Sequence, residues 1–120
     1  MKIVADNTVP YLKGKEGIDN YMSGLKRQIE YLRKLAPDAC FLFIGPSDMS
    51  TSIDGEMQTY PILPRLVEAM KAMAEECGIA YWDLYAAMGG RGSMMKWVDA
   101  YLAGPDYVHF TPKGARHVGN

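Results

Sequence analysis

Apolar residues along this chain occur in two patterns, short continuous runs and positions repeated at helical spacing. Residues 2–5 form a short apolar run with β-branched side chains, and residues 39–44 form a run that is apolar on both faces. A run that is apolar on both faces is typical of a strand buried in a parallel sheet. A third run, residues 79–85, follows Gly78. The sequence therefore predicts three strands.

Between these runs, apolar residues recur at three- and four-residue spacing, which predicts helices. The first helix carries Ile18, Tyr21, Met22, Leu25, Ile29, Leu32 and Leu35. It ends before Pro37, because the residue before a proline is disfavoured in the helical conformation. The second helix carries Leu63, Leu66, Val67, Met70, Met73 and Cys77. Gly78 is its expected C-terminal stop.

Two shorter helices are predicted in the last third of the chain. Residues 94–101 carry apolar side chains at helical spacing, and Gly104 and Pro105 follow as the break that ends this helix. A final helix is expected to begin at Thr111 as its cap, with Pro112 in the first position. The segments 7–17 and 47–59 are rich in turn-forming and polar residues, so they are predicted to be loops.

The predicted order is strand, helix, strand, helix, strand, helix, with connections long enough for parallel pairing. The fold class is therefore α/β, a partial doubly wound, flavodoxin-like parallel sheet with flanking helices and three strand–helix units. Residues 1–120 form one domain. Ligands bind beyond the carboxyl ends of the strands in such sheets, and we expect residues 106–109 to lie at that edge.

Composition and charge narrow the possible partners. The chain has 120 residues and a formal net charge of −1, which gives no electrostatic reason to expect nucleic acid or an anionic membrane as a partner. No apolar run reaches the length of a membrane span, and no secretory signal follows Met1. The two cysteines, Cys40 and Cys77, are predicted to be buried thiols. With two scattered histidines they lack metal-ligand spacing, so no metal and no cofactor are expected.

The candidate chemistry lies at Asp106 and His109. The two residues are three positions apart, between a Gly-Pro break and a Thr-Pro helix start. An aspartate placed in this way can fix one ring nitrogen of the histidine, and the other nitrogen can then take a proton from a nucleophile. The alternative interpretation is a solvent-facing loop histidine that caps a helix.

Residues 106–111, Asp-Tyr-Val-His-Phe-Thr, resemble the last conserved block of the SGNH/GDSL hydrolases, an Asp-x-x-His pair just before the final helix. Residues 37–46 and 78–84 resemble the fourth and fifth strands of that family, and Asn7 occupies the place of its Gly-x-Asn block. The resemblance covers nearly the whole chain, but only Asp-x-x-His is specific. It implies a serine esterase acting on small acyl esters, carbohydrate acetyl groups among them. It also implies that His109 is the base, Asp106 its orienting partner and Asn7 an oxyanion donor.

The chain also departs from the family pattern. Ala5 and Asp6 precede Asn7, so the glycine of the block is missing, and Asn7 is either an oxyanion donor or a turn residue. No Gly-Asp-Ser motif occurs anywhere in the chain. We therefore expect the C-terminal portion of a longer esterase, truncated at both ends, without its nucleophile and inactive alone.

Ser47 does not replace that nucleophile. It follows a predicted strand, but a nucleophile elbow has the pattern Gly-x-Ser-x-Gly, and Met49 stands where the second glycine belongs. Ser47 is predicted to form a turn, and both Ser47 and Asp48 to line the pocket. His117, on the final helix, is predicted to be a surface residue.

Two further expectations concern partners. The missing nucleophile favours an alternative function, a non-catalytic α/β module that binds a small ligand or a protein partner at the same strand edge. An unpaired edge strand at residues 2–5 would recruit other chains, so the isolated chain is expected to self-associate.

Overall fold

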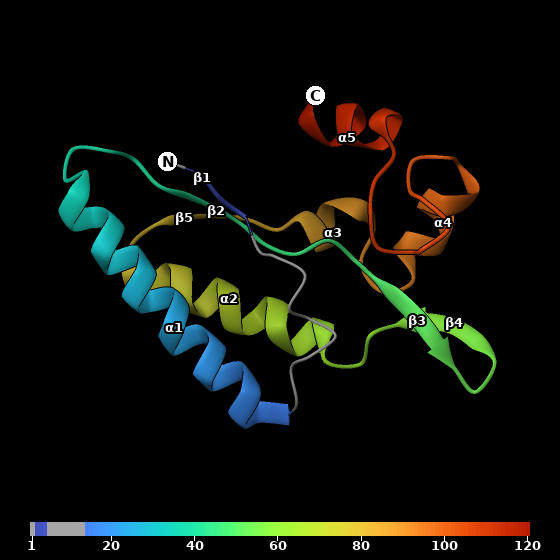
Figure 1. Ribbon diagram of the computed structural model, residues 1–120, viewed down its shortest axis with the longest axis horizontal. Coiled ribbons are helices and arrows are strands. Elements are labelled where there is room, and N and C mark those ends of the chain that lie inside the picture. The colour runs from blue at the N-terminus through green and yellow to red at the C-terminus, as the bar shows by residue number, and fades with distance from the viewer. Residues whose placement is uncertain (1, 5–13) are drawn as a thin grey trace.

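The computed structural model describes residues 2–4 and 14–120 (Figure 1). In chain order the elements are β1 (Lys2–Val4), α1 (Gly14–Leu35), β2 (Leu42–Ile44), β3 (Ser50–Ile53), β4 (Glu56–Thr59), α2 (Leu63–Cys77), β5 (Ala80–Trp82), α3 (Leu84–Met88), α4 (Ser93–Asp99) and α5 (Pro112–Gly119).

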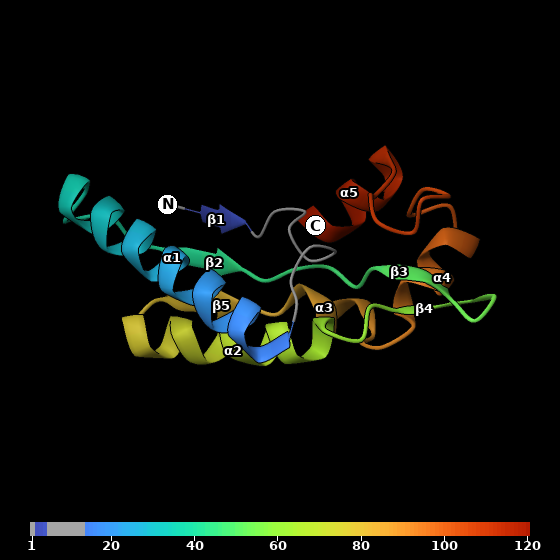
Figure 2. The same ribbon diagram turned by 60° about the horizontal axis from the view of Figure 1, so that its bottom comes forward.

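The main sheet is parallel, in the order β1-β2-β5. Its register aligns Ile3 with Phe43 and Phe43 with Tyr81. The chain advances across the sheet in one direction, so right-handed connections place α1 and α2 on the same face, as Figure 2 shows. This arrangement confirms the predicted α/β fold with a parallel sheet and flanking helices.

The main core lies between this sheet and the two long helices. Phe43 is fully buried in the middle of β2 and stacks on Tyr81, with the ring centroids 5.9 Å apart. The helical positions predicted from apolar spacing supply the other side; those buried are Ile18, Met22, Leu25, Ile29, Leu63, Leu66, Val67, Met70 and Met73. Gly78 ends α2 in a left-handed conformation, with φ of 68°, as predicted.

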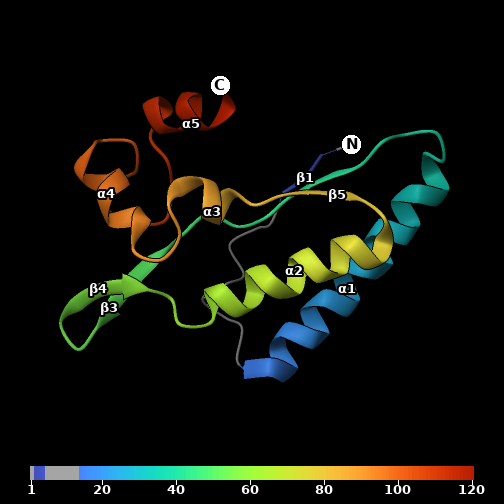
Figure 3. The same cartoon turned by 180° about the vertical axis from the view of Figure 1, so that it is seen from behind.

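A second, smaller core lies at the carboxyl-end side of the sheet. It is built by α3, α4 and α5, which gather there (Figures 1 and 3). Its buried members are Leu84, Met88, Met94 and Ala103, and Ile44 of β2 packs against them. Elsewhere on the strands, Leu42 and Trp82 are each 37% exposed. The accessible surface of 7305 Å² is larger than the roughly 6,500 Å² expected for a folded monomer of this mass. The chain therefore leaves more surface exposed than a typical monomer of its size.

The segment 47–59 is not the loop predicted from its polarity. It contains the hairpin of β3 and β4, with Ser50 opposite Thr59 and Ile53 opposite Glu56. The turn is Asp54-Gly55, whose φ angles of 52° and 83° are both positive. Asp-Gly favours this kind of two-residue hairpin turn, so the local signal was present.

Four other predictions need correction. The segment 7–17 is not loop throughout, because α1 begins inside it at Gly14. The strand predicted at 39–44 begins only at Leu42, and Cys40 is exposed while Cys77 is half-buried. The run 79–85 stops being a strand at Trp82, because Asp83 caps α3 by accepting a hydrogen bond from the Ala86 amide at 2.9 Å.

Candidate active site

The loop that carries Asp106 and His109, called here the 106–109 loop, is closed at its base by backbone hydrogen bonds. Ala103 and Phe110 form an antiparallel bridge. The Gly104 amide donates to the His109 carbonyl at 2.8 Å, and the Thr111 amide donates to the Leu102 carbonyl at 3.0 Å. These bonds fix where the chain enters and leaves the loop.

The middle of the loop is held against the rest of the molecule. Val108 packs against the main core, and Tyr107 and Phe110 pack against the smaller one. The Ser50 amide at the start of β3 donates to the Tyr107 carbonyl at 3.1 Å. Because the connection from β2 leads directly to β3, this bond places the loop on the carboxyl-end side of the sheet, as predicted.

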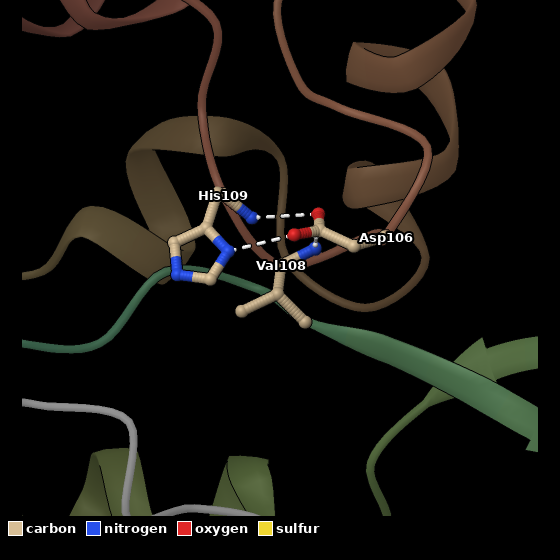
Figure 4. Close-up of polar contacts among 3 residues, drawn as sticks. All are labelled: Asp106, Val108 and His109. Carbon is tan, nitrogen blue, oxygen red and sulfur yellow. Dashed lines mark hydrogen bonds and ion pairs between the residues drawn. The ribbon is translucent and has the colours of Figure 1, made fainter.

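Asp106 holds both the backbone and the ring of His109. Its Oδ1 accepts hydrogen bonds from the Val108 amide at 2.9 Å and from the His109 amide at 3.0 Å. Its Oδ2 lies 2.7 Å from Nδ1 of His109. Figure 4 shows the carboxylate and the ring facing each other, with Nε2 on the opposite side of the ring from Asp106. Tyr107, between them, has a φ of 59°, which gives the turn its tightness.

The electrostatics assign the ring proton. The hydrogen bond from the His109 side chain, followed by those from the backbone amides, lowers the pKa of Asp106 to about 2. An ionised carboxylate can only accept hydrogen bonds, so Nδ1 carries the proton at neutral pH. In neutral His109, Nε2 is then the nitrogen with the lone pair. That is the state in which an imidazole removes a proton from a nucleophile.

Both side chains are accessible from solvent. The His109 side chain is 64% exposed and that of Asp106 is 51% exposed. His109 is not the predicted alternative of a helix cap, because Thr111 fills that role by accepting from the Gly114 amide at 3.1 Å. Helix α5 then begins at Pro112, as predicted.

The other predicted site residues are placed differently. Asp48 has no exposed surface, so it lies in the interior and not on a surface where a substrate binds. Ser47 is half-buried in the connection between β2 and β3. Asn7 lies outside the described residues. His117 is exposed on α5, with its ring centroid 5.5 Å from that of Trp97.

The structure adds residues to which the sequence pattern does not point. Ser50 and Tyr107 join the hairpin to the loop, and Asp48 with Thr59 joins the hairpin to α4. Only the turn signal at Asp54-Gly55 could have pointed to the hairpin that makes these contacts. Among the described residues, no group of three or more His, Cys, Asp or Glu side chains could hold a metal ion. No helix of residues 14–120 is long and apolar enough to cross a membrane.

Comparison with known proteins gives a likeness in structure alone. No family model matches the sequence, and no curated protein matches it. A solved structure described as "Peptidoglycan O-acetylesterase in action, 5 min" superposes with a TM-score of 0.81 at 22% sequence identity. The match covers 98% of this chain and 34% of that chain. The chain thus has the fold of about a third of that protein.

Proposed function

We propose that this chain is the part of an ester hydrolase that supplies the base and its orienting carboxylate. The observation that carries the proposal is the 2.7 Å contact between Asp106 Oδ2 and His109 Nδ1, at the carboxyl-end side of a parallel sheet. The fold shared with a peptidoglycan O-acetylesterase supports it. So does the resemblance of residues 106–111 to the Asp-x-x-His block of the SGNH/GDSL hydrolases.

In the proposed reaction, Nε2 of His109 removes the proton from a serine hydroxyl that another part of the protein supplies. The serine oxygen attacks the acyl carbonyl, and His109 returns the proton to the departing alcohol. Water then releases the acyl group by the same route. Asp106 keeps Nδ1 protonated and stabilises the imidazolium that forms. The substrate class is a small acyl ester, with acetyl groups on carbohydrate as the first choice, and no cofactor takes part.

The test needs the longer protein that joins this chain to a nucleophile. His109→Ala should lower its kcat/KM on an acetyl ester by at least about 10³-fold, because triad members act as a unit. His117→Ala is the matched control, since it removes the other histidine of the chain, and it should retain most activity. Equal activity of the two variants would remove His109 from the mechanism.

A further inference from the structure

Asp48 is a buried carboxylate that the reaction described above does not use. It is 0% exposed, and burial is the largest cause of a raised pKa. Its Oδ1 accepts a hydrogen bond from Thr59 Oγ1 at 2.8 Å, and its Oδ2 accepts one from the Met94 amide at 2.9 Å. Burying a carboxylate costs free energy unless hydrogen bonds of this kind satisfy its oxygens. The function of Asp48 therefore depends on the groups that these bonds hold in place.

One of its partners is the start of α4. The residue before that helix is Gly92, which has no side chain to cap the first amides. Thr59 Oγ1 accepts from the Gly92 amide at 2.8 Å, and Asp48 accepts from Met94. The hairpin therefore caps a helix that lies far from it in the sequence. A carboxylate near a helix N-terminus is also favoured by the helix dipole.

Asp48 is connected to the 106–109 loop in two ways, each through a stretch of chain and backbone hydrogen bonds. Along the first, α4 ends where the Leu102 and Ala103 amides donate to the Trp97 carbonyl at 2.8 and 3.2 Å. These two residues form one side of the loop base. Along the second, β3 begins two residues after Asp48, and its Ser50 amide holds the Tyr107 carbonyl at 3.1 Å.

We propose that Asp48 is a positioning residue for the pair of Asp106 and His109, because it fixes α4 and the hairpin, the two elements that hold the 106–109 loop. This inference rests on the proposed function for its catalytic meaning. Asp48 contacts no reacting group of the proposed ester hydrolysis. It acts through the backbone of Tyr107 on one side and through α4 on the other.

The test reads the pairing itself, by following the carboxyl carbon of Asp106 through a pH titration in the 120-residue chain. In the wild type this carboxyl should titrate at a pKa of about 2. Asp48→Ala should move it toward the ordinary value of 3.8, because the loop is released and the bonds from His109 weaken. A simple charge effect is excluded, since the raised pKa of Asp48 leaves this carboxyl group protonated and uncharged at the pH where Asp106 titrates.

Two variants serve as controls. Asp48→Asn keeps the shape and can accept from Met94 while it donates to Thr59, so the pKa of Asp106 should stay near 2. Asp83→Ala removes the aspartate that caps α3 by accepting from Ala86, so it removes a helix cap of the same kind without touching the hydrogen bonds that hold the loop. It should also leave the pKa of Asp106 near 2. The second measurement is hydrogen exchange of the backbone amides in residues 104–111. Exchange should be faster in Asp48→Ala than in the wild type and unchanged in the two controls. It can be measured even if the chain self-associates.

A folded Asp48→Ala chain whose Asp106 still titrates near 2 would overturn the proposal, as would an Asp48→Asn variant that behaves like Asp48→Ala. If Asp48→Ala does not fold, Thr59→Val decides. That variant keeps the shape of a nearly buried residue and removes only the bonds of its hydroxyl group, and it should raise the pKa of Asp106 above that of the wild type; an unchanged pKa would overturn the proposal. Esterase activity enters none of these outcomes, so they stand apart from failure of the proposed function.

Discussion

The closest packing around the site is at Gly114, where α5 crosses the base of the 106–109 loop. A Cβ built on Gly114 would overlap the Leu102 carbonyl oxygen and lie 2.7 Å from the Leu102 carbonyl carbon. The obstacle is backbone and not a flexible side chain. Leu102 cannot move away easily, because its carbonyl accepts the Thr111 amide at 3.0 Å and so closes the loop. Gly114→Ala must therefore displace either α5 or the loop base.

The expected loss of stability follows from three contributions. Alanine favours a helix over glycine by about 1 kcal/mol. Forcing an extra methyl group into packed structure costs about 1–3 kcal/mol, and loss of the Thr111 bond to Leu102 costs about 1 kcal/mol more. The net destabilisation is about 2 kcal/mol, which corresponds to a fall in Tm of roughly 5–12 °C for a chain of this size.

The matched control is Gly119→Ala, at the other end of the same helix, where the added Cβ would meet nothing within 4 Å. It should be neutral or slightly stabilising. Thermal unfolding followed by circular dichroism compares the two variants with the wild type. A Gly114→Ala chain as stable as Gly119→Ala would refute the packing described for α5 and the loop base.

Three other predictions follow from the described residues. Because the pKa of Asp106 is lowered to about 2 from 3.8, its contribution to the free energy of unfolding is present above pH 4 and lost as the pH falls toward 2. Urea unfolding at pH 5 and pH 2.5 should show this loss in the wild type but not in Asp106→Asn, and an equal pH dependence of both would contradict it. The isolated chain should self-associate through the β1 edge, so sedimentation should give a mass above 13.4 kDa; a monomer with a cooperative thermal transition would speak against this. The isolated chain should not hydrolyse p-nitrophenyl acetate above a denatured control, and saturable hydrolysis that is abolished by Ser47→Ala would make Ser47 a nucleophile.

Much of the fold could be predicted because apolar spacing is a local property. The spacing in α1 and α2 marks the residues that face the sheet, and Pro37 and Gly78 mark where those helices end. The strand at 39–44 was predicted too long because the run is apolar on both faces. In the structure, α1 and α2 cover one face, while Ile44, at the carboxyl end of β2, packs against the smaller core. Leu42 is therefore partly exposed.

The contacts of the site are of two kinds, those between residues close in the sequence and those between distant segments. The pairing of Asp106 with His109 spans three residues and could be predicted from their spacing. The bond from Ser50 to Tyr107 and those around Asp48 join segments that are distant in the sequence. Their partners depend on where the hairpin lies, and the polarity of that segment predicts a loop there. A loop position beyond a strand predicts that Asp48 lines the pocket, whereas the hairpin places it in the interior.

The most direct test of the central claim is labelling by a fluorophosphonate probe, which reacts only with an activated serine. In the longer protein that contains this chain together with a nucleophile, we predict labelling of one serine in the wild type and in His117→Ala, and its loss in His109→Ala. Labelling that survives in His109→Ala would show that another base activates the serine. The absence of any labelled serine in the wild type would contradict the esterase proposal and favour a non-catalytic module that binds its ligand at the same strand edge.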